Sequence, residues 1–136
     1  MLSFSKLSLA KLDLTGNGLG GSGFSAMYYS GLNQNRSLHE LNISDINLTS
    51  KDDDLEGLEN LANLLILHPK LNDINLLFNP ITTVGAKILI PALSKNKKIS
   101  SFKVDTTLPE EIYVALFRNG NKSTKKKRKK TRKKKK

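Results

Sequence analysis

Few residues of this chain have the types and spacing that catalysis or metal binding requires. The two histidines, His39 and His68, lie far apart in the pattern described below, and we expect both to be solvated surface residues. The three consecutive carboxylates of residues 52–54 could hold a hard cation, but we favour a helix N-terminus, where acidic side chains complement the helix dipole. The chain contains no cysteine, which excludes a disulfide framework, a thiolate zinc site and a cysteine nucleophile. The sequence therefore predicts no catalytic residue, no metal site and no cofactor.

A glycine-rich run is the remaining candidate for a ligand-binding motif. Gly20, Gly21 and Gly23 do not match a phosphate-binding loop, because the Lys-Ser/Thr pair that should follow is absent. We expect a loose turn there, followed by a first helix at about residues 23–32.

The elements that must position any functional surface follow from an eleven-residue pattern, L-x-x-L-x-L-x-x-N-x-L. Its copies begin at Leu9, Leu38, Leu71 and Ile99. Ile46 stands at the asparagine position of the second copy and Thr107 at that of the fourth, which then decays. The alternating L-x-L has strand periodicity, so each copy predicts a strand whose apolar residues face a shared interior. Self-similarity at this period is typical of repeat proteins.

Helix-like segments separate these copies. Apolar residues at three- and four-residue spacing predict a helix over residues 55–66, with Ser50 as its cap. A second helix is expected over residues 85–95, with a bend or break near Ile90 because Pro91 lacks an amide donor. A short closing helix over residues 109–118 opens on a proline and should bury Ile112, Ala115 and Leu116.

Residues 7–118 resemble the leucine-rich-repeat family, specifically its ribonuclease-inhibitor-like class. The resemblance implies an α/β fold, a right-handed solenoid of about 3.5 repeats with parallel strands on the concave side and helices on the convex side. It also implies a ladder of turn asparagines, which Ile46 interrupts, so the second turn should be less regular. We expect residues 1–121 to form the repeat domain and residues 122–136 a disordered polybasic tail.

The exposed strand positions of the concave side are the candidate binding surface. Acids outnumber bases there, which favours a protein partner over a nucleic-acid phosphate backbone. Leu77 and Phe78 add an apolar pair of the kind on which interface energy concentrates, although Phe78 could equally pack into the turn. The candidate partner-binding residues are Asp13, Glu40, Asn42, Asp73, Asn75, Leu77, Phe78 and Lys103, and the other exposed positions are Lys11, Thr15, Ser44, Ser101 and Asp105.

The positive charge of the chain is concentrated at its C-terminus. The formal net charge is +11, but twelve of the 23 basic residues lie from Lys122 onwards, where there is no acid, so residues 1–121 carry about one net negative charge. Six consecutive cations resemble a nuclear localisation signal and also suit RNA, an acidic protein surface such as actin or tubulin, or anionic lipid. These cations are Lys125, Lys126, Lys127, Arg128, Lys129 and Lys130.

A narrower resemblance concerns the end of the chain. Residues 96–102, the expected helix from Pro109 to Asn119 and the basic finish are similar to the closing repeat of the tropomodulin and leiomodin family, whose repeat domain binds actin at filament pointed ends. The segments that bind actin and tropomyosin ahead of the repeats in that family have no counterpart in this sequence.

The sequence thus predicts a non-catalytic protein-interaction module or scaffold, with RNA or ribonucleoprotein binding through the tail and actin-cytoskeleton binding as alternatives. No stretch approaches the roughly 20 apolar residues of a membrane span, and residues 1–10 do not form the apolar core of a signal peptide. We therefore expect an intracellular protein, nuclear or cytoplasmic and cytoskeletal, with no small-molecule substrate.

Overall fold

The computed structural model of the chain describes residues 9–49, 51 and 55–120, and these residues form an α/β fold. In chain order the elements are β1 (Lys11–Asp13), α1 (Gly20–Ser30), the 3₁₀ helix η2 (Leu32–Gln34), β2 (Glu40–Asn42), α2 (Leu55–Leu67), β3 (Asp73–Asn75), α3 (Thr82–Lys95), β4 (Ser101–Lys103), α4 (Glu110–Leu116) and β5 (Arg118–Asn119). The expected alternation of strands and helices is confirmed.

The strands form one five-stranded sheet in the order β1-β2-β3-β4-β5. The first four strands are parallel, and their register aligns Leu12 with Leu41, Ile74 and Phe102. These are the central apolar residues of the four pattern copies, so the pattern predicts both the strands and their alignment. The antiparallel strand β5, which pairs Arg118 with Phe102, was not expected from the sequence.

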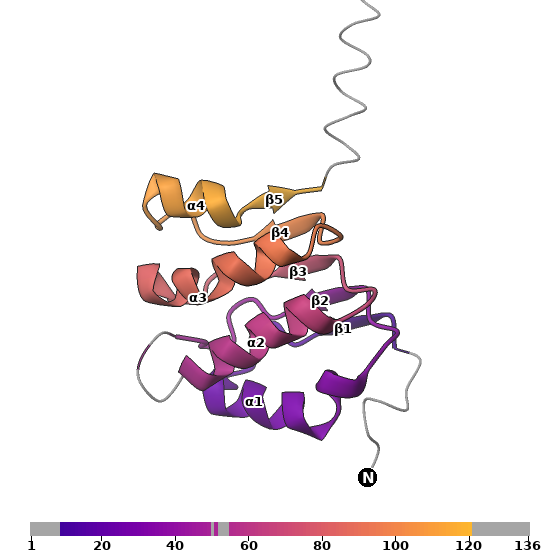
Figure 1. The fold of residues 1–136 in the computed structure, drawn as a ribbon. Helices are drawn as coiled ribbons and strands as arrows, with labels where there is room; N and C mark the ends of the chain where they lie inside the picture. The colour runs from indigo at the N-terminus through magenta and orange to yellow at the C-terminus, as the bar shows by residue number, and fades with distance from the viewer. Residues whose placement is uncertain (1–8, 50, 52–54, 121–136) are drawn as a thin grey trace, which may run out of the picture.

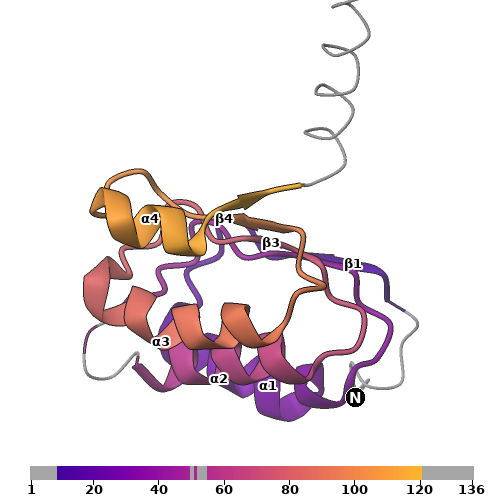
Figure 2. The same ribbon diagram turned by 45° about the horizontal axis from the view of Figure 1, so that its top comes forward.

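The molecule has two layers, with α1, α2 and α3 packed side by side against one face of the sheet (Figures 1 and 2). The core lies between the layers and includes Leu41, Ile74 and Phe102 from the strands and Phe24, Leu61 and Leu89 from the helices. The sheet is not curled, so we call its surface away from the helices the open face, in place of the expected concave side.

The glycine-rich run lies inside α1 and is not a loose turn before it. The helix begins at Gly20, three residues earlier than expected, and Gly21 is buried against α2. A Cβ atom on Gly57 of α2 would lie 2.7 Å from the Cα of Gly21 and 2.8 Å from its carbonyl oxygen. Glycine is therefore needed at Gly57, where the two helix backbones approach each other at Gly21.

The helix α3 continues through Pro91, so of the bend or break expected near Ile90 the break does not occur. Pro91 is exposed, while Leu89, Ala92 and Leu93 on either side of it are buried. Burial of these neighbours offsets the backbone hydrogen bond that proline cannot donate.

The other two helices follow the sequence pattern with small corrections. The helix α2 ends at Leu67, and Ile66 is 36% exposed where burial was expected, because Leu64 and Leu65 supply the buried face. In α4, Leu116 is buried but Ala115 is exposed, since the short helix contacts the core through one side near its end. Among the described residues no helix is long and apolar enough to cross a membrane. The expected cap Ser50, the acids of residues 52–54 and residues 122–136 lie outside the described residues.

Candidate partner-binding surface

Three turns that follow the strands share an unusual backbone conformation. Gly16, Asp45 and Phe78 occupy equivalent positions in the first three repeats, and their φ angles are +78°, +54° and +63°. The fold thus requires the left-handed region at this position. Glycine adopts it at little cost and aspartate tolerates it, whereas a bulky residue there is a genuine outlier.

Phe78 is held in this conformation by its backbone amide. The amide N–H groups of Gly16 and Asp45 each donate to a carbonyl of the next repeat, at 3.2 Å and 2.9 Å. In the third turn the amide of Phe78 donates instead to the carboxylate of Asp105, at 3.0 Å to Oδ1 and 3.1 Å to Oδ2. The Phe78 side chain is 68% exposed. The sequence left open whether the Phe78 side chain is exposed or packs into the turn, and the structure shows that it is exposed.

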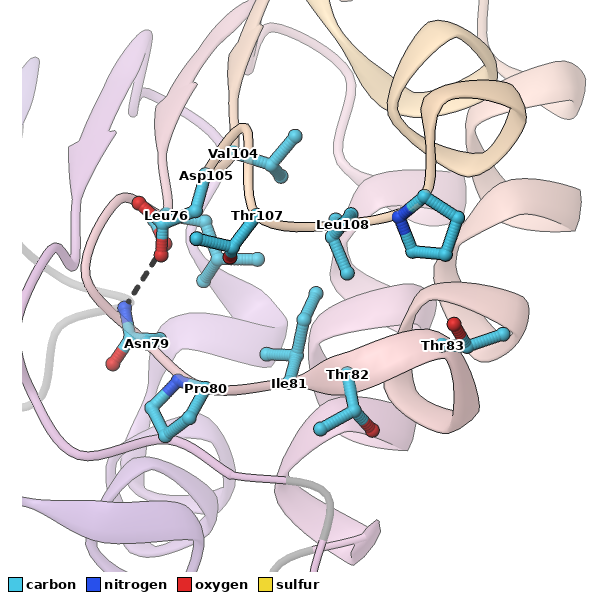
Figure 3. Close-up of a pocket in the computed structure, with 11 residues that line it drawn as sticks. Leu76, Asn79, Pro80, Ile81, Thr82, Thr83, Val104, Asp105, Thr107 and Leu108 are labelled. Atoms are coloured by element: carbon cyan, nitrogen blue, oxygen red, sulfur yellow. Dashed lines mark hydrogen bonds between the residues drawn. The ribbon is translucent and has the colours of Figure 1, made fainter.

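A surface hollow of about 290 Å³ lies beside this turn (Figure 3). Its lining is largely apolar, and Asp105, which accepts the Phe78 amide, also lines it. The residues around the hollow are Leu76, Asn79, Pro80, Ile81, Thr82, Thr83, Val104, Asp105, Thr107, Leu108 and Pro109. The exposed Phe78 thus belongs to a turn that borders an apolar recess between the third and fourth turns.

The hollow coincides with the end of a hydrogen-bonded asparagine bridge. The Asn79 side chain accepts from the amides of Ile46 and Leu48 at 3.1 Å and 2.9 Å, and donates to the carbonyls of Ile43 and Leu76 at 2.8 Å and 3.2 Å. The Asn79 side chain thus bonds to the backbone of its own turn and of the second turn, in which Ile46 stands at the asparagine position. The fourth turn has Thr107 at this position, so no amide bridges the third turn to the fourth in the same way.

The second turn, where irregularity was expected, contains two non-glycine residues with positive φ. These are Asp45 at +54° and Asn47 at +65°. Their short polar side chains are among those that tolerate the left-handed region, so the turn forms although its asparagine is missing.

The open face brings most of the predicted partner-binding residues together. A groove across the four parallel strands is lined by Lys11, Leu12, Asp13, Glu40, Leu41, Asn42, Asp73, Asn75 and Lys103. Lys11 and Glu40 form an ion pair at 3.9 Å between largely exposed side chains, so its contribution to stability is small. The Thr15 hydroxyl and backbone amide donate to Asp13 and lower the pKa of its carboxyl.

Two expected positions do not contribute to this face. Ser44 and Ser101 are buried, with exposures of 6% and 8%, because neighbouring loops and β5 cover them. Leu77 is half-buried and lies at the strand end of the face, beside Phe78. The predicted surface thus has an acid-leaning polar part along the strands and an apolar part at their ends.

The expectation for His68 is wrong, since this side chain is 4% exposed and part of the fold. Its Nδ1 accepts the backbone amides of Lys70 and Leu71, each at 3.1 Å, so Nε2 carries the proton and donates to Asn35 Oδ1 at 3.2 Å. Burial, and to a smaller extent the electrostatic influence of Arg36, His39 and Lys70, together lower the pKa of His68 to about 4. His39 is exposed, as expected.

Asn35 and Asn96 occupy the positions equivalent to His68 in the neighbouring repeats. Asn35 Oδ1 accepts the amides of Ser37 and Leu38, and Asn96 donates to the Leu65 carbonyl at 2.7 Å. These buried polar residues were missed by the sequence analysis. A signal was available, because each stands three residues before the first apolar residue of a pattern copy.

The described residues contain no group of three or more side chains that could hold a metal ion. The candidate cation ligands at residues 52–54 and the six tail cations, Lys125 to Lys130, lie outside the part that the structure describes. No known protein-family model and no curated protein matches this chain.

Proposed function

We propose that this chain is a non-catalytic protein-binding module of the leucine-rich-repeat type. Four copies of the pattern, four parallel strands in register and three helices on one face support this assignment. In this proposal the open face and the Phe78 turn form a single surface that binds a protein partner.

The single observation that carries the proposal is the conformation of Phe78. A bulky side chain in the left-handed region costs about 1–2 kcal/mol, and the exposed ring recovers little of this by burial. Glycine at the equivalent position of the first repeat shows that the turn itself does not need an aromatic residue. Strained residues of this kind concentrate at binding sites, where the strain serves recognition.

The surface suggests the chemistry of the partner. Phe78 and the adjacent hollow suit an apolar side chain of the partner, and Asp13, Glu40 and Asp73 along the strands suit basic residues around it. An exposed aromatic residue beside a recess is typical of interface hot spots, whose truncation costs 2 kcal/mol or more, on the order of a thirtyfold loss in affinity.

The proposal is tested by the substitution Phe78→Gly in the full chain. Glycine removes the ring and relieves the strain, so we expect unfolding free energy to be unchanged or up to about 1 kcal/mol higher. Partners captured from a cell lysate by the intact chain should be retained at least tenfold less by the variant. Capture is quantified by mass spectrometry and stability by urea denaturation.

The matched control is Leu67→Ser. Leu67 is 69% exposed, much like Phe78, but lies at the opposite end of the strands, so this variant should retain the same partners. If Phe78→Gly captures the same proteins as the intact chain, the Phe78 turn is not the binding surface and the proposal fails.

A further inference from the structure

The two ends of the parallel strands carry opposite charge, although the net charge of residues 1–121 is close to zero. The loops that lead into the strands, residues 31–39, 67–72 and 94–100, contain no acid. Their basic residues are Arg36, Lys70, Lys95, Lys97 and Lys98. The turns at the other end of the strands carry Asp45 and Asp105, followed by Glu110 and Glu111 of α4, against Lys51.

The basic loops lie side by side. The amide of Asn72 donates to the His39 carbonyl at 3.0 Å, and the amide of Ser100 donates to the Asn72 carbonyl at 2.9 Å. The Lys98 ammonium reaches the Pro69 carbonyl at 3.0 Å. Cations from three repeats are therefore gathered along one edge of the molecule.

Some of the cations near this edge have a structural role. Arg118 donates to the carbonyls of Leu93, Asn96 and Ile99, and burial lowers the pKa of its guanidinium. Lys98 holds the neighbouring loop, as described above. Arg118 satisfies carbonyl groups near the end of α3 and Lys98 satisfies one just after the end of α2, so these two side chains need no further explanation.

Arg36, Lys70 and Lys97 differ from them, and we call these three residues the basic edge. All three are exposed. The one ion pair found within the described residues joins Lys11 to Glu40, so no carboxylate there is paired with a residue of the basic edge. Glu40 and Asp73 begin the adjacent strands and face the groove of the open face.

The polybasic tail is attached at the same edge. The strand β5 runs toward the loops that precede the strands (Figures 1 and 2), and the amide of Gly120 donates to the Ser100 carbonyl at 2.8 Å. Lys122, two residues further on, begins a stretch of fifteen residues with twelve bases. A polyanion held by this stretch is thereby kept at high effective concentration beside the basic edge.

We propose that the basic edge and the tail together bind the phosphate backbone of a nucleic acid. This inference does not depend on the protein-binding role of the open face. Duplex nucleic acid carries one charge per about 1.7 Å and releases condensed counterions when cations replace them, which suits closely spaced lysines and arginines. The three loops contain no Phe, Tyr or Trp for base stacking, so recognition is of the backbone and independent of sequence.

A lipid surface fits this edge less well. Of the large apolar residues in the three basic loops, Leu67 is exposed, whereas Leu32, Leu38, Leu71 and Ile99 are buried. One exposed leucine can bury little apolar surface in a bilayer, so binding to anionic lipid would rest mainly on charge.

The test uses the full chain with Arg36→Gln, Lys70→Gln and Lys97→Gln combined, and a fluorescent duplex DNA of mixed sequence. Anisotropy titrations at several salt concentrations give the slope of log affinity against log salt. Each phosphate contact contributes about 0.9 to that slope, so we expect it to fall by about 2.7, with affinity at least about tenfold lower at 0.15 M salt.

The control variant combines Lys11→Gln, Lys51→Gln and Lys103→Gln, which removes the same charge from other parts of the surface. Its slope should change by less than about 1. The charge-preserving variant Arg36→Lys, Lys70→Arg, Lys97→Arg should bind as the intact chain does, which separates charge from folding. Equal losses in the two glutamine variants, or none in the first, would overturn the role of the basic edge.

Competition decides the class of the polyanion. Polyglutamate at equal charge concentration should displace the DNA poorly, because its lower charge density releases fewer counterions. Displacement by polyglutamate, or by vesicles containing anionic lipid, as effective as that by unlabelled DNA would overturn the assignment to nucleic acid.

Discussion

The two ends of the parallel strands differ in how the backbone polar groups of their loops are paired. Where the chain enters the strands, Asn35, His68 and Asn96 are all buried and hydrogen-bonded to loop backbone. Where it leaves them, Asn79 alone bridges two turns, and the fourth turn has Thr107 beside an open hollow. Backbone groups must be paired wherever the chain turns, and we call the first end, where three buried side chains pair the loops, the closed end and the second the open end. A hollow of about 290 Å³ lies at the open end and a smaller one of about 190 Å³ at the closed end.

The comparison also shows where the molecule tolerates strain. The closed end has no positive-φ residue among Asn35, His68 and Asn96, whereas the open end has Asp45, Asn47, Phe78 and Thr82. We infer that stability is concentrated at the closed end, and that the strained turns of the open end serve the proposed protein partner. Three substitutions or conditions would sharpen or break this division.

The largest effect is expected for Asn79→Ala. This change leaves the buried amides of Ile46 and Leu48 and the carbonyl of Ile43 without their partner, and each unpaired buried group costs about 1–3 kcal/mol. We expect the unfolding free energy to fall by about 3–4 kcal/mol, as measured by urea denaturation.

Asn17→Ala is the matched control, at the same position of the first turn. Asn17 is exposed, and its side chain makes one bond, at 3.0 Å, to the Leu14 carbonyl. The loss should be under about 1 kcal/mol. Similar losses in both variants would mean that Asn79 does not bridge the two turns.

The next effect is acid destabilisation through His68 at the closed end. The folded-state pKa is about 4 and the unfolded value is near 6.5, so the folded protein favours the neutral ring. The contribution of His68 to the unfolding free energy is fully present above pH 6.5 and is lost as the pH falls toward 4. The loss is at most about 1.4 kcal/mol per pH unit and about 3 kcal/mol in total.

The variant His68→Asn provides the comparison, because Asn35 and Asn96 show that asparagine fits this position in other repeats. Urea denaturation between pH 7 and 4 should show a shallower loss for the variant than for the intact chain. Parallel curves for the two proteins would place the acid sensitivity elsewhere.

The smallest effect is expected for Thr107→Asn, which should extend the asparagine bridge to the fourth turn. The new amide can reach backbone groups of the third turn and fill part of the hollow, so we expect a gain of about 1 kcal/mol in thermal or urea unfolding. Capture of a protein partner should weaken in the same variant. A loss of stability would show that the fourth turn cannot accept the bridge.

The sequence predicted the elements that depend on apolar periodicity. Leu41, Ile74 and Phe102 are buried at the predicted strand centres, and α2 lies where the three- and four-residue spacing indicated. Their burial follows from local alternation, which can be seen along the chain without knowledge of neighbouring repeats.

What the sequence did not show depends on contacts between repeats. His68 was expected at the surface because its partner Asn35 lies 33 residues away, and Gly21 was assigned to a turn because its neighbour Gly57 is in another helix. The position of Phe78 was left open for the same reason, since Asp105, which holds its amide, belongs to the next repeat. Each case is a long-range pairing that local patterns do not contain.

The short strand β5 has a consequence for self-association. Parallel strands at the edge of a sheet offer unpaired amides and carbonyls to a second molecule, and such edges promote aggregation. At β4 this position is already occupied by Arg118 and Asn119, and the Arg118 side chain ties the strand to the end of α3. Copies of this protein therefore cannot extend the sheet through β4 into fibres unless β5 is first displaced.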